Sequence, residues 1–242
     1  MSETPNEIEL RRIYGNRFGG KAAYRMAVWS ILAEYFSRWI PPSSTVLDLG
    51  AGYCEFVNNV AAQKRFAMDL NPEIHHRADA DVTVLHQNCC DAWPLDDGAV
   101  DAVFTSNFLE HLPGKSEVQK VLLQAFRVLR PGGCFIAVGP NIKCVPGAYW
   151  DFFDHYVELT ELSLAEALSM CGYRIEARIA RFLPYTMSDN RQYPLWTLRT
   201  YLAVPLLWRA FGKQFLVISR KPCDSQKETK IQRDTDYGAN SC

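Results

Sequence analysis

The chain has 242 residues, of which 48% are hydrophobic, enough to bury the core of one α/β domain. Its formal net charge of −1 and pI of about 6.5 give no broadly basic surface, so a nucleic-acid substrate is not favoured. No apolar run reaches the length of a membrane span, and the acidic first residues carry no hydrophobic signal segment. The eight cysteines include no Cys-x-x-Cys pair, so we expect reduced thiols in a cytoplasmic protein and no metal site.

The first predicted element is a helix that starts near Ala22 and carries apolar residues at helical spacing until Pro41 and Pro42 end it. We assign residues 1–44 to an N-terminal helical cap on the sheet. The segment before the helix, residues 11–18, is basic and aromatic. It has two equally weighted interpretations: a segment that closes over a ligand, or a solvated helix end.

Residues 45–49 are predicted to form a buried strand that runs into a turn containing Gly50 and Gly52. A helix is expected to follow from residue 53 to about residue 62. A strand, a glycine turn and a helix N-terminus together are typical of a nucleotide-binding element in an α/β protein. The third glycine of the dinucleotide fingerprint is missing, and Asp48 lies in the strand end. A ligand that carries positive charge therefore fits better than a pyrophosphate.

Further strands are predicted at residues 65–69, 82–86, 100–106 and 134–138. Asp69 ends the second strand, where an acid typically accepts hydrogen bonds from ribose hydroxyls; a solvated acid is the alternative. An amphipathic helix is expected between the last two of these strands and is ended by Pro-Gly-Gly. Its apolar face consists of Val118, Val121, Leu122, Ala125, Val128 and Leu129.

Residues 139–159 form a long loop that is rich in aromatic side chains and follows the fifth strand. Open α/β sheets bind ligands beyond the carboxyl ends of their strands, where this loop must emerge. Asp154 and His155 are neighbours here, so His155 is our first candidate for a general base, and His111 is the second. Packing or orientation of a substrate is the alternative role for each histidine. After the loop, a capping box at residues 163–166 is predicted to start a helix.

Residues 194–212 are strongly apolar and contain only two charges, Arg199 and Arg209. We favour a pair of short helices, interrupted at Pro205, that covers the sheet edge and the pocket. The alternative is a patch that contacts a membrane interface or a lipid-linked acceptor. Residues 213–220 are then predicted as the last strand.

Five motifs in this order resemble the class I S-adenosylmethionine-dependent methyltransferases, from about Val46 to Lys221. They are Val-Leu-Asp-Leu-Gly-Ala-Gly (46–52), Met-Asp-Leu-Asn-Pro (68–72), Asp91, Asp-Ala-Val-Phe-Thr-Ser-Asn-Phe-Leu-Glu-His-Leu (101–112) and Val-Leu-Arg-Pro-Gly-Gly (128–133). The resemblance implies an α/β, Rossmann-like fold with a seven-stranded, mostly parallel sheet, an antiparallel last strand and helices on both faces.

The resemblance also implies S-adenosyl-L-methionine as the cofactor. The residues that it places at the cofactor, from the methionine end to the adenine edge, are Asn107, Asp48, Gly50, Gly52, Asp69, Leu70, Asp91 and Ala92. Asp69 would hold the ribose, Leu70 the adenine face, and Asp91 with the backbone of Ala92 the adenine edge. Asp96, Asp97 and Asp101 lie nearby and compete for that role, but we interpret these three as loop-solvation and strand-start residues. Cys54 stands where the family often has a third glycine, a position that we interpret as serving helix–strand packing.

The expected organisation is a methyltransferase domain over residues 45–221, with substrate-side insertions at 139–160 and 183–212. Residues 222–242 are polar and expected to be a disordered tail. The Asn/Asp-Pro-Pro-Tyr/Phe motif of methyltransferases that act on nucleobase or glutamine amines is missing after the fourth strand, which makes nucleic acid still less favoured.

We predict methyl transfer to a small-molecule acceptor, with a sugar of a glycan or lipid-linked saccharide as the leading candidate. Family resemblance in the Tyr-x-x-Arg-Phe and Gly-Lys-Gln-Phe segments suggests this acceptor. An isoprenoid or quinone-type acceptor is the runner-up. A cofactor-binding protein without turnover and an NAD-dependent oxidoreductase are the alternatives from other classes. If residues 194–212 touch a membrane, the protein would be peripheral to its inner face.

Overall fold

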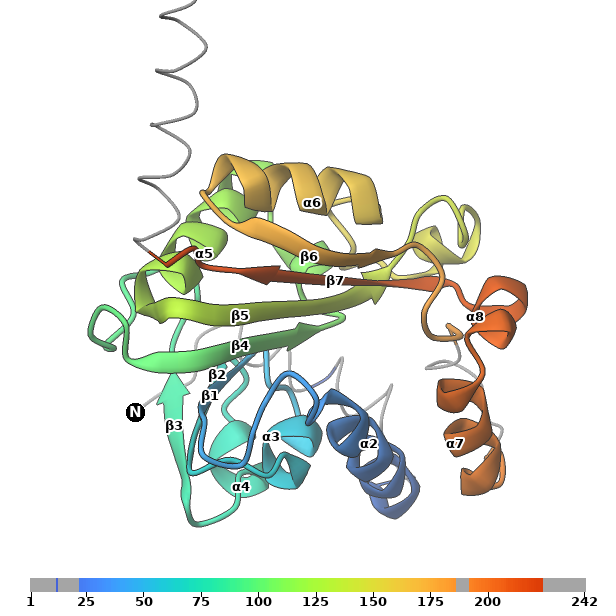
Figure 1. Ribbon diagram of the computed structural model, residues 1–242, viewed down its shortest axis with the longest axis horizontal. Helices are drawn as coiled ribbons and strands as arrows, with labels where there is room; N and C mark the ends of the chain where they lie inside the picture. Colours follow the sequence, from blue (N-terminus) through green and yellow to red (C-terminus); the bar gives the residue numbers. More distant parts are fainter. Residues whose placement is uncertain (1–11, 13–21, 186–191, 224–242) are drawn as a thin grey trace, which may run out of the picture.

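A computed structural model describes Arg12, residues 22–185 and residues 192–223 of the chain. At its centre is one seven-stranded sheet with the order β3-β2-β1-β4-β5-β7-β6 (Figure 1). Its strands are β1 (Thr45–Leu49), β2 (Lys64–Asp69), β3 (Val82–His86), β4 (Val100–Ser106), β5 (Leu129–Pro140), β6 (Arg174–Ile179) and β7 (Gln214–Arg220). The first five strands pair in parallel, and β7 is antiparallel to both of its neighbours. The predicted fold class is confirmed.

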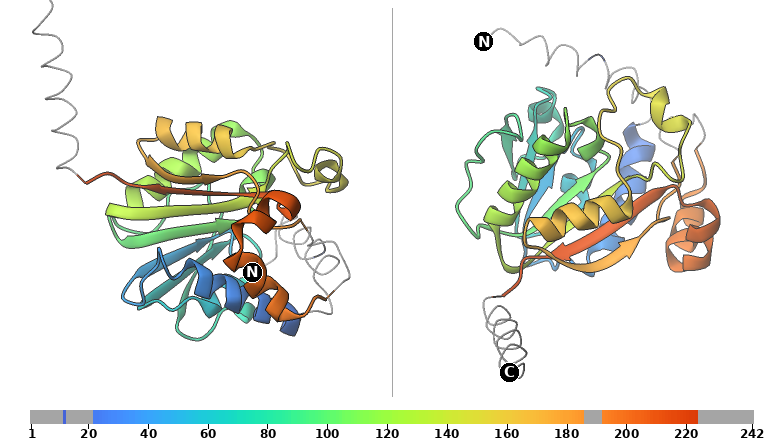
Figure 2. Two further views of the ribbon diagram at one scale, coloured as in Figure 1. Left: turned by 45° about the vertical axis from the view of Figure 1, so that its right-hand side comes forward. Right: turned by 90° about the horizontal axis from the view of Figure 1, so that it is seen from above.

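Helices cover both faces of the sheet (Figures 1 and 2). One face is covered by α5 (Lys115–Val128) and α6 (Glu161–Met170). The other is covered by α2 (Ala22–Phe36), α3 (Glu55–Asn59), α4 (Ile74–Arg77), α7 (Leu195–Ala203) and α8 (Pro205–Phe211). Because side chains alternate along a strand, Leu47 and Leu49 of β1 lie in the core under α5, whereas Val46 lies in the core under α2.

Strand β5 is longer than predicted and begins directly after α5. Leu129, expected on the apolar face of the helix, is instead the first residue of β5 and pairs with Val100. The register then shifts, and a Cβ at Gly133 would lie 3.0 Å from the carbonyl oxygen of Asp101. Glycine therefore lets the strand continue through the Pro-Gly-Gly segment that was expected to be a break.

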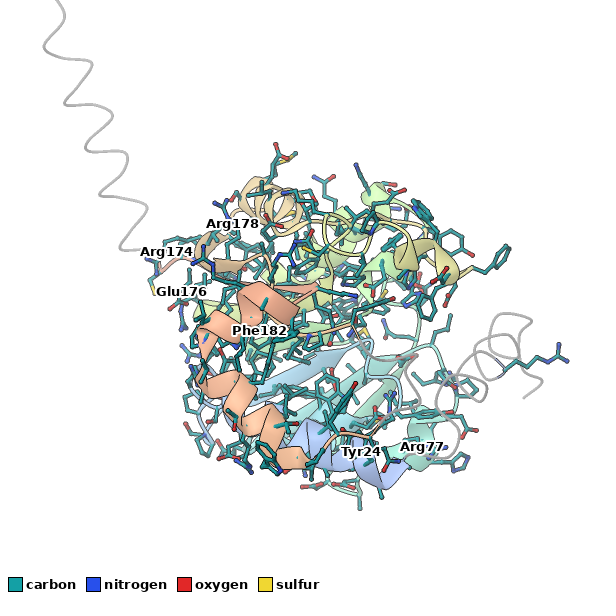
Figure 3. All side chains as sticks on the ribbon, turned by 90° about the vertical axis from the view of Figure 1, so that its right-hand side faces the viewer. Tyr24, Arg77, Arg174, Glu176, Arg178 and Phe182 are labelled. Carbon is teal, nitrogen blue, oxygen red and sulfur yellow. The ribbon has the colours of Figure 1, made fainter. Side chains whose placement is uncertain are left out.

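Strand β6 was not predicted at a definite position, because its pattern is that of an exposed edge. Arg174, Glu176 and Arg178 point outward from it (Figure 3), and Glu176 pairs with Arg220 at 2.6 Å. Charged side chains on an edge strand oppose pairing with another chain.

Two helix starts differ from the prediction. Helix α3 is five residues long, because Cys54 has a left-handed backbone (φ 61°) and delays the start to Glu55. Helix α6 begins at Glu161, and its capping box is formed by Thr160 and Ser163 rather than by residues 163–166. The Ser163 N–H donates to Thr160 Oγ1 at 3.0 Å, and the Thr160 N–H donates to Ser163 Oγ at 2.9 Å.

The predicted break at Pro205 is confirmed, because this residue starts α8. Trp208 of α8 packs edge-on against Phe182 at 5.2 Å, so part of the segment covers the sheet (Figure 3). Other side chains of α7 and α8 face outward: Trp196 of α7 is 67% exposed, and Leu206 of α8 is 71% exposed. Within the described ranges, no helix is both long enough and apolar enough to cross a membrane. Apart from Arg12, the basic–aromatic stretch lies outside the described residues, as does the tail from residue 224.

Candidate functional site

The glycine turn lies at the carboxyl ends of the parallel strands, where the strand order reverses between β1 and β4. Gly50 (φ 71°) and Gly52 (φ 54°) both have left-handed backbones. The N–H groups of Gly50 and Ala51 donate to the carbonyl oxygen of Met68 at 2.9 and 3.1 Å. These bonds fold the turn back over the end of β2. Cys54 repeats the left-handed conformation, which adds a backbone reason for glycine at that position in relatives.

Phe108 lies against Gly50. A Cβ at Gly50 would lie 2.2 Å from Cγ of Phe108, so only glycine fits this position. Nothing in the sequence pattern marks Phe108, apart from its place directly after Asn107. The contact ties the glycine turn to the segment after β4.

Two carboxyl groups, those of Asp69 and Asp48, accept backbone hydrogen bonds from the turn and from the segments next to it. Asp69 accepts hydrogen bonds from the N–H of Gly52 at 2.7 Å and from the N–H of Asn71 at 2.8 Å. Asp48 accepts one from the N–H of Val57 at 3.2 Å. Both acids are buried, and so is Asn71. Two of the predicted site residues therefore meet at the turn, where Asp69 keeps lone pairs for a ligand.

Negative charge is concentrated around this turn. Burial raises the pKa of Asp48 well above its usual range, and the nearby Asp69 and Glu55 raise it further. Burial also raises the pKa of Asp69, against the lowering effect of its backbone hydrogen bonds. Arg25 of α2 pairs with Glu55 at 2.6 Å and compensates one of the three charges. A bound cation would stabilise the others.

The loop after β3 begins beside Asp69, because His86 pairs with Asp69 in the sheet. His86 Nε2 lies 3.0 Å from the carbonyl oxygen of Leu70. Asp91 and Ala92 are exposed further along this loop. Leu70, Asp91 and Ala92, three of the predicted cofactor residues, therefore lie on the β2–β3 side of the turn.

Asn107 lies on the other side of the turn, directly after β4. Its backbone is left-handed (φ 50°), a conformation that asparagine tolerates better than most residues, and its N–H donates to Val138 O at 2.9 Å. The side-chain Nδ2 donates to Ser106 Oγ at 3.0 Å. Its Oδ1 is buried and has no hydrogen-bond partner among the described residues. A buried acceptor without a donor is unusual, and a ligand donor would satisfy it.

Glu110, His111 and His155 form a cluster at the same edge of the sheet. Glu110 and His111 lie in the short 3-10 helix η1 (Leu109–His111), and His155 follows η2 (Ala148–Asp151). The two histidine rings are 4.8 Å apart between centroids. Both predicted catalytic histidines are therefore in one place. Glu110 joins them from a position that its surface-like sequence context did not indicate.

The acid–histidine pairing differs from the expectation. Asp154 lies beside His111, with Nδ1 at 3.1 Å from Oδ2 and 2.8 Å from the carbonyl oxygen. His155 instead places its Nδ1 2.9 Å from the carbonyl oxygen of Tyr149. Asp154 and His155 are neighbours in the sequence, but their side chains have different partners. Asp154 therefore orients His111, which belongs to the segment after β4.

The two loops are joined by backbone hydrogen bonds. The N–H groups of Tyr156 and Val157 donate to the carbonyl oxygen of Glu110 at 2.8 and 3.1 Å. Tyr149, which is fully buried, donates its hydroxyl to the carbonyl oxygen of Val157. This buried tyrosine closes the loop on itself and fixes the position of His155.

Burial and charge affect the cluster in opposite ways. Burial raises the pKa of Glu110, and the nearby His111 lowers it. Burial lowers the pKa of His111, but the hydrogen bond to Asp154 and the charge of Glu110 outweigh it, so that the pKa is raised. The positive charge of a protonated His111 would thus compensate the negative charges of Glu110 and Asp154.

Comparison with known proteins shows similarity to methyltransferases over part of the chain. Residues 47–137 match the family model described as a methyltransferase domain. A probable S-adenosylmethionine-dependent methyltransferase of Mycolicibacterium smegmatis is 34% identical over 103 residues, 42% of this chain and 38% of that protein. Malonyl-[acyl-carrier protein] O-methyltransferase of Methylococcus capsulatus is 27% identical over 182 residues, 68% of this chain and 65% of that protein. The chain thus covers less than two thirds of the length of each of these curated relatives.

Solved structures show the same fold. A chain in the complex between the Haloferax volcanii Trm112 methyltransferase activator and a methyltransferase has a TM-score of 0.65 at 18% identity, covering 92% of this chain and 100% of that one. A SAM-dependent methyltransferase of Archaeoglobus fulgidus has a TM-score of 0.63 at 18% identity, covering 87% of this chain and 99% of that one. The sheet order and the glycine turn agree with the match over residues 47–137, and this part of the chain is similar to S-adenosylmethionine-dependent methyltransferases.

Proposed function

We propose that this protein transfers a methyl group from S-adenosylmethionine to a hydroxyl oxygen of a small molecule, with a sugar of a glycan or lipid-linked saccharide as the leading acceptor. The observation that carries the proposal is the acidic glycine turn, where buried Asp48 and Asp69 lie at the ends of adjacent strands. The cofactor supplies a methyl group on a positively charged sulfur, which is already an activated leaving group.

The residues at the strand ends fit this cofactor. Asp69, held by two backbone N–H groups, would accept hydrogen bonds from the ribose hydroxyls. Leu70, Asp91 and Ala92 would lie along the adenine. Asn107 Oδ1, the buried acceptor without a donor, would receive a hydrogen bond from the methionine ammonium.

The glycine turn would supply the surface for the methionine half. Gly50 and Gly52 let the backbone approach a ligand closely. A cation bound near Asp48 would lower the raised pKa of this carboxyl group and stabilise its charged form, which suits a sulfonium better than a pyrophosphate.

The loop after β5 supports an oxygen acceptor. His111 follows Asn107 by four residues, and the ring of His155 lies beside that of His111. Here the two histidines would act on the acceptor hydroxyl and orient it. Three aromatic residues close to His155 in the sequence have exposed side chains: Trp150 (57%), Phe153 (92%) and Tyr156 (55%). Flat aromatic faces beside polar groups suit a sugar ring, which has apolar C–H faces and hydroxyl edges.

A second acceptor class rests on the apolar surface of α7 and α8. The exposed Trp196 and Leu206 would suit an isoprenoid or quinone-type acceptor presented at a membrane interface. Radiolabelled methyl transfer to a panel of saccharides and of polyprenyl quinols would separate the two classes. Transfer only to the quinols would overturn the sugar assignment.

Calorimetric titration with S-adenosylhomocysteine tests the cofactor part. We expect saturable binding that Asp69→Ala weakens at least tenfold and that the exposed Asp96→Ala leaves unchanged. NAD is the control ligand and should give no heat. Failure of the wild-type protein to bind S-adenosylhomocysteine would refute the proposal, whatever the acceptor.

A further inference from the structure

The Glu110, His111 and His155 cluster has the composition of a metal site. Each of the three side chains offers one ligand atom, and these atoms all lie within 4.8 Å of one another. Glu110 and His155 are buried, and His111 is partly buried. Among the described residues, this is the one group of this kind. Two histidines and one glutamate are a ligand set of catalytic zinc sites, which keep a further position open.

The hydrogen-bond partners of both histidine rings are also typical of metal ligands. His111 Nδ1 lies against both oxygens of Asp154 noted above, and His155 Nδ1 lies 2.9 Å from the carbonyl oxygen of Tyr149. A carbonyl oxygen can only accept, so it fixes the proton of each neutral ring on Nδ1 and directs the Nε2 lone pair to the other side. Metal-binding histidines are typically oriented in this way, by a carboxylate or a carbonyl oxygen on the second nitrogen.

We infer that Glu110, His111 and His155 bind one divalent transition-metal ion of the Zn²⁺ type. The ligand set is a carboxylate oxygen and two imidazole nitrogens, with Asp154 and the Tyr149 carbonyl as the groups that orient the rings. Tetrahedral zinc with these ligands needs a spacing of about 3.4 Å between ligand atoms. The widest separation in the cluster, up to 4.8 Å, would therefore contract by up to about 1.4 Å.

An internal ion pair is the competing explanation. A protonated His111 beside Glu110 and Asp154 would balance the buried acids without any metal. This arrangement involves His111 alone, whereas a bound metal ion would use both rings, whose centroids are 4.8 Å apart. Uptake of metal by the protein separates the two explanations.

The ion gives the proposed acceptor site a specific chemistry. Its open position would bind the acceptor hydroxyl oxygen and make loss of the hydroxyl proton easier. This part rests on the proposed function, whereas metal binding itself does not. Titration with S-adenosylhomocysteine tests the cofactor, and titration with metal tests the cluster, so failure of one is distinguishable from failure of the other.

The experiment is a metal titration of the full-length protein after removal of metal with a chelator. Zn²⁺ affinity is measured in competition with a chromophoric chelator, and Co²⁺ binding by visible absorption. We expect one ion per chain and a Co²⁺ spectrum of a low-symmetry site. Glu110→Gln and His155→Gln should each weaken binding by more than about 100-fold, and Asp154→Asn by about 10- to 100-fold.

The matched control is His76→Gln, an exposed histidine outside the cluster, which should bind Zn²⁺ like the wild type. Circular dichroism and S-adenosylhomocysteine binding confirm that each variant is folded. Absence of stoichiometric Zn²⁺ in the wild type overturns the inference in favour of the ion pair. Equal affinity of the cluster variants and His76→Gln overturns it as well, because the ion would then be bound elsewhere.

Discussion

The two halves of the candidate site are built in different ways. On the β1–β2 side, a contiguous turn is held by backbone N–H groups that donate to Asp48 and Asp69. On the β4–β5 side, side chains from two separate loops meet at His111 and His155. The first half is set by local backbone geometry and the second by contacts between distant segments. Changes to the backbone should therefore affect the first half most, and changes to single hydrogen bonds the second.

The largest effect is expected at Gly50. In Gly50→Val, the new side chain would meet the Phe108 ring and a left-handed backbone, so we expect a loss of roughly 2–5 kcal/mol in the free energy of unfolding. Urea denaturation measures it. Gly147→Ala is the matched control, because a Cβ there has no neighbour within 4 Å, and it should change little. Equal stability of the two variants would mean that the Phe108 contact is not formed.

Asp48→Asn should change folding stability and cofactor binding in opposite directions. The Asp48 pKa is raised by burial, so the folded state keeps a proton that the unfolded chain loses above a pH of about 4. Wild-type stability should therefore fall as pH rises from there through the raised pKa. Asparagine can still accept from the Val57 N–H but cannot ionise, which should flatten this fall and raise stability at neutral pH.

Thermal unfolding of wild type and Asp48→Asn across this pH range measures the effect, and the exposed Asp96→Asn serves as the control. The same Asp48→Asn substitution should weaken binding of S-adenosylmethionine, which carries the sulfonium charge, more than binding of S-adenosylhomocysteine, which does not. Parallel pH profiles for wild type and Asp48→Asn would contradict the assignment of the raised pKa to this group.

A smaller effect is expected at the β5 loop. Tyr149→Phe removes the donor to the Val157 carbonyl and should lower the free energy of unfolding by about 1–2 kcal/mol. The loop that carries His155 should also exchange its amide hydrogens faster, while the glycine turn stays protected. Tyr156→Phe, on an exposed ring, is the control. Faster exchange at the glycine turn would show that the two halves are coupled.

The smallest effect is expected outside both halves. Thr160→Ala removes the cap of α6 and should cost about 1 kcal/mol without changing cofactor affinity. Thr200→Ala, in the exposed part of α7, is the comparison and should cost less. A clear loss of cofactor affinity in Thr160→Ala would mean that α6 contributes to the site.

The same difference explains which features could be predicted from the sequence. Strands β3 and β4 have the predicted bounds, because both are apolar runs with clear breaks. The glycine turn could be predicted because the residues that form it, between Gly50 and Gly52, are consecutive. The pairing of Asp154 with His111 was not, since it spans 43 positions and leaves no periodic signal. The Thr160 cap and the edge strand β6 were also missed, because polar patterns are weak signals.

The position of the last strand in the sheet has a consequence for synthesis. β7 lies between β5 and β6, so neither strand has this neighbour until residues 214–220 have been made. During translation, the backbone edge of β5 stays open and β6 cannot join the sheet. A product that stops before Gln214 would leave these two edges exposed and prone to pair with other chains. Completion of the sheet therefore depends on the insertion of this one strand.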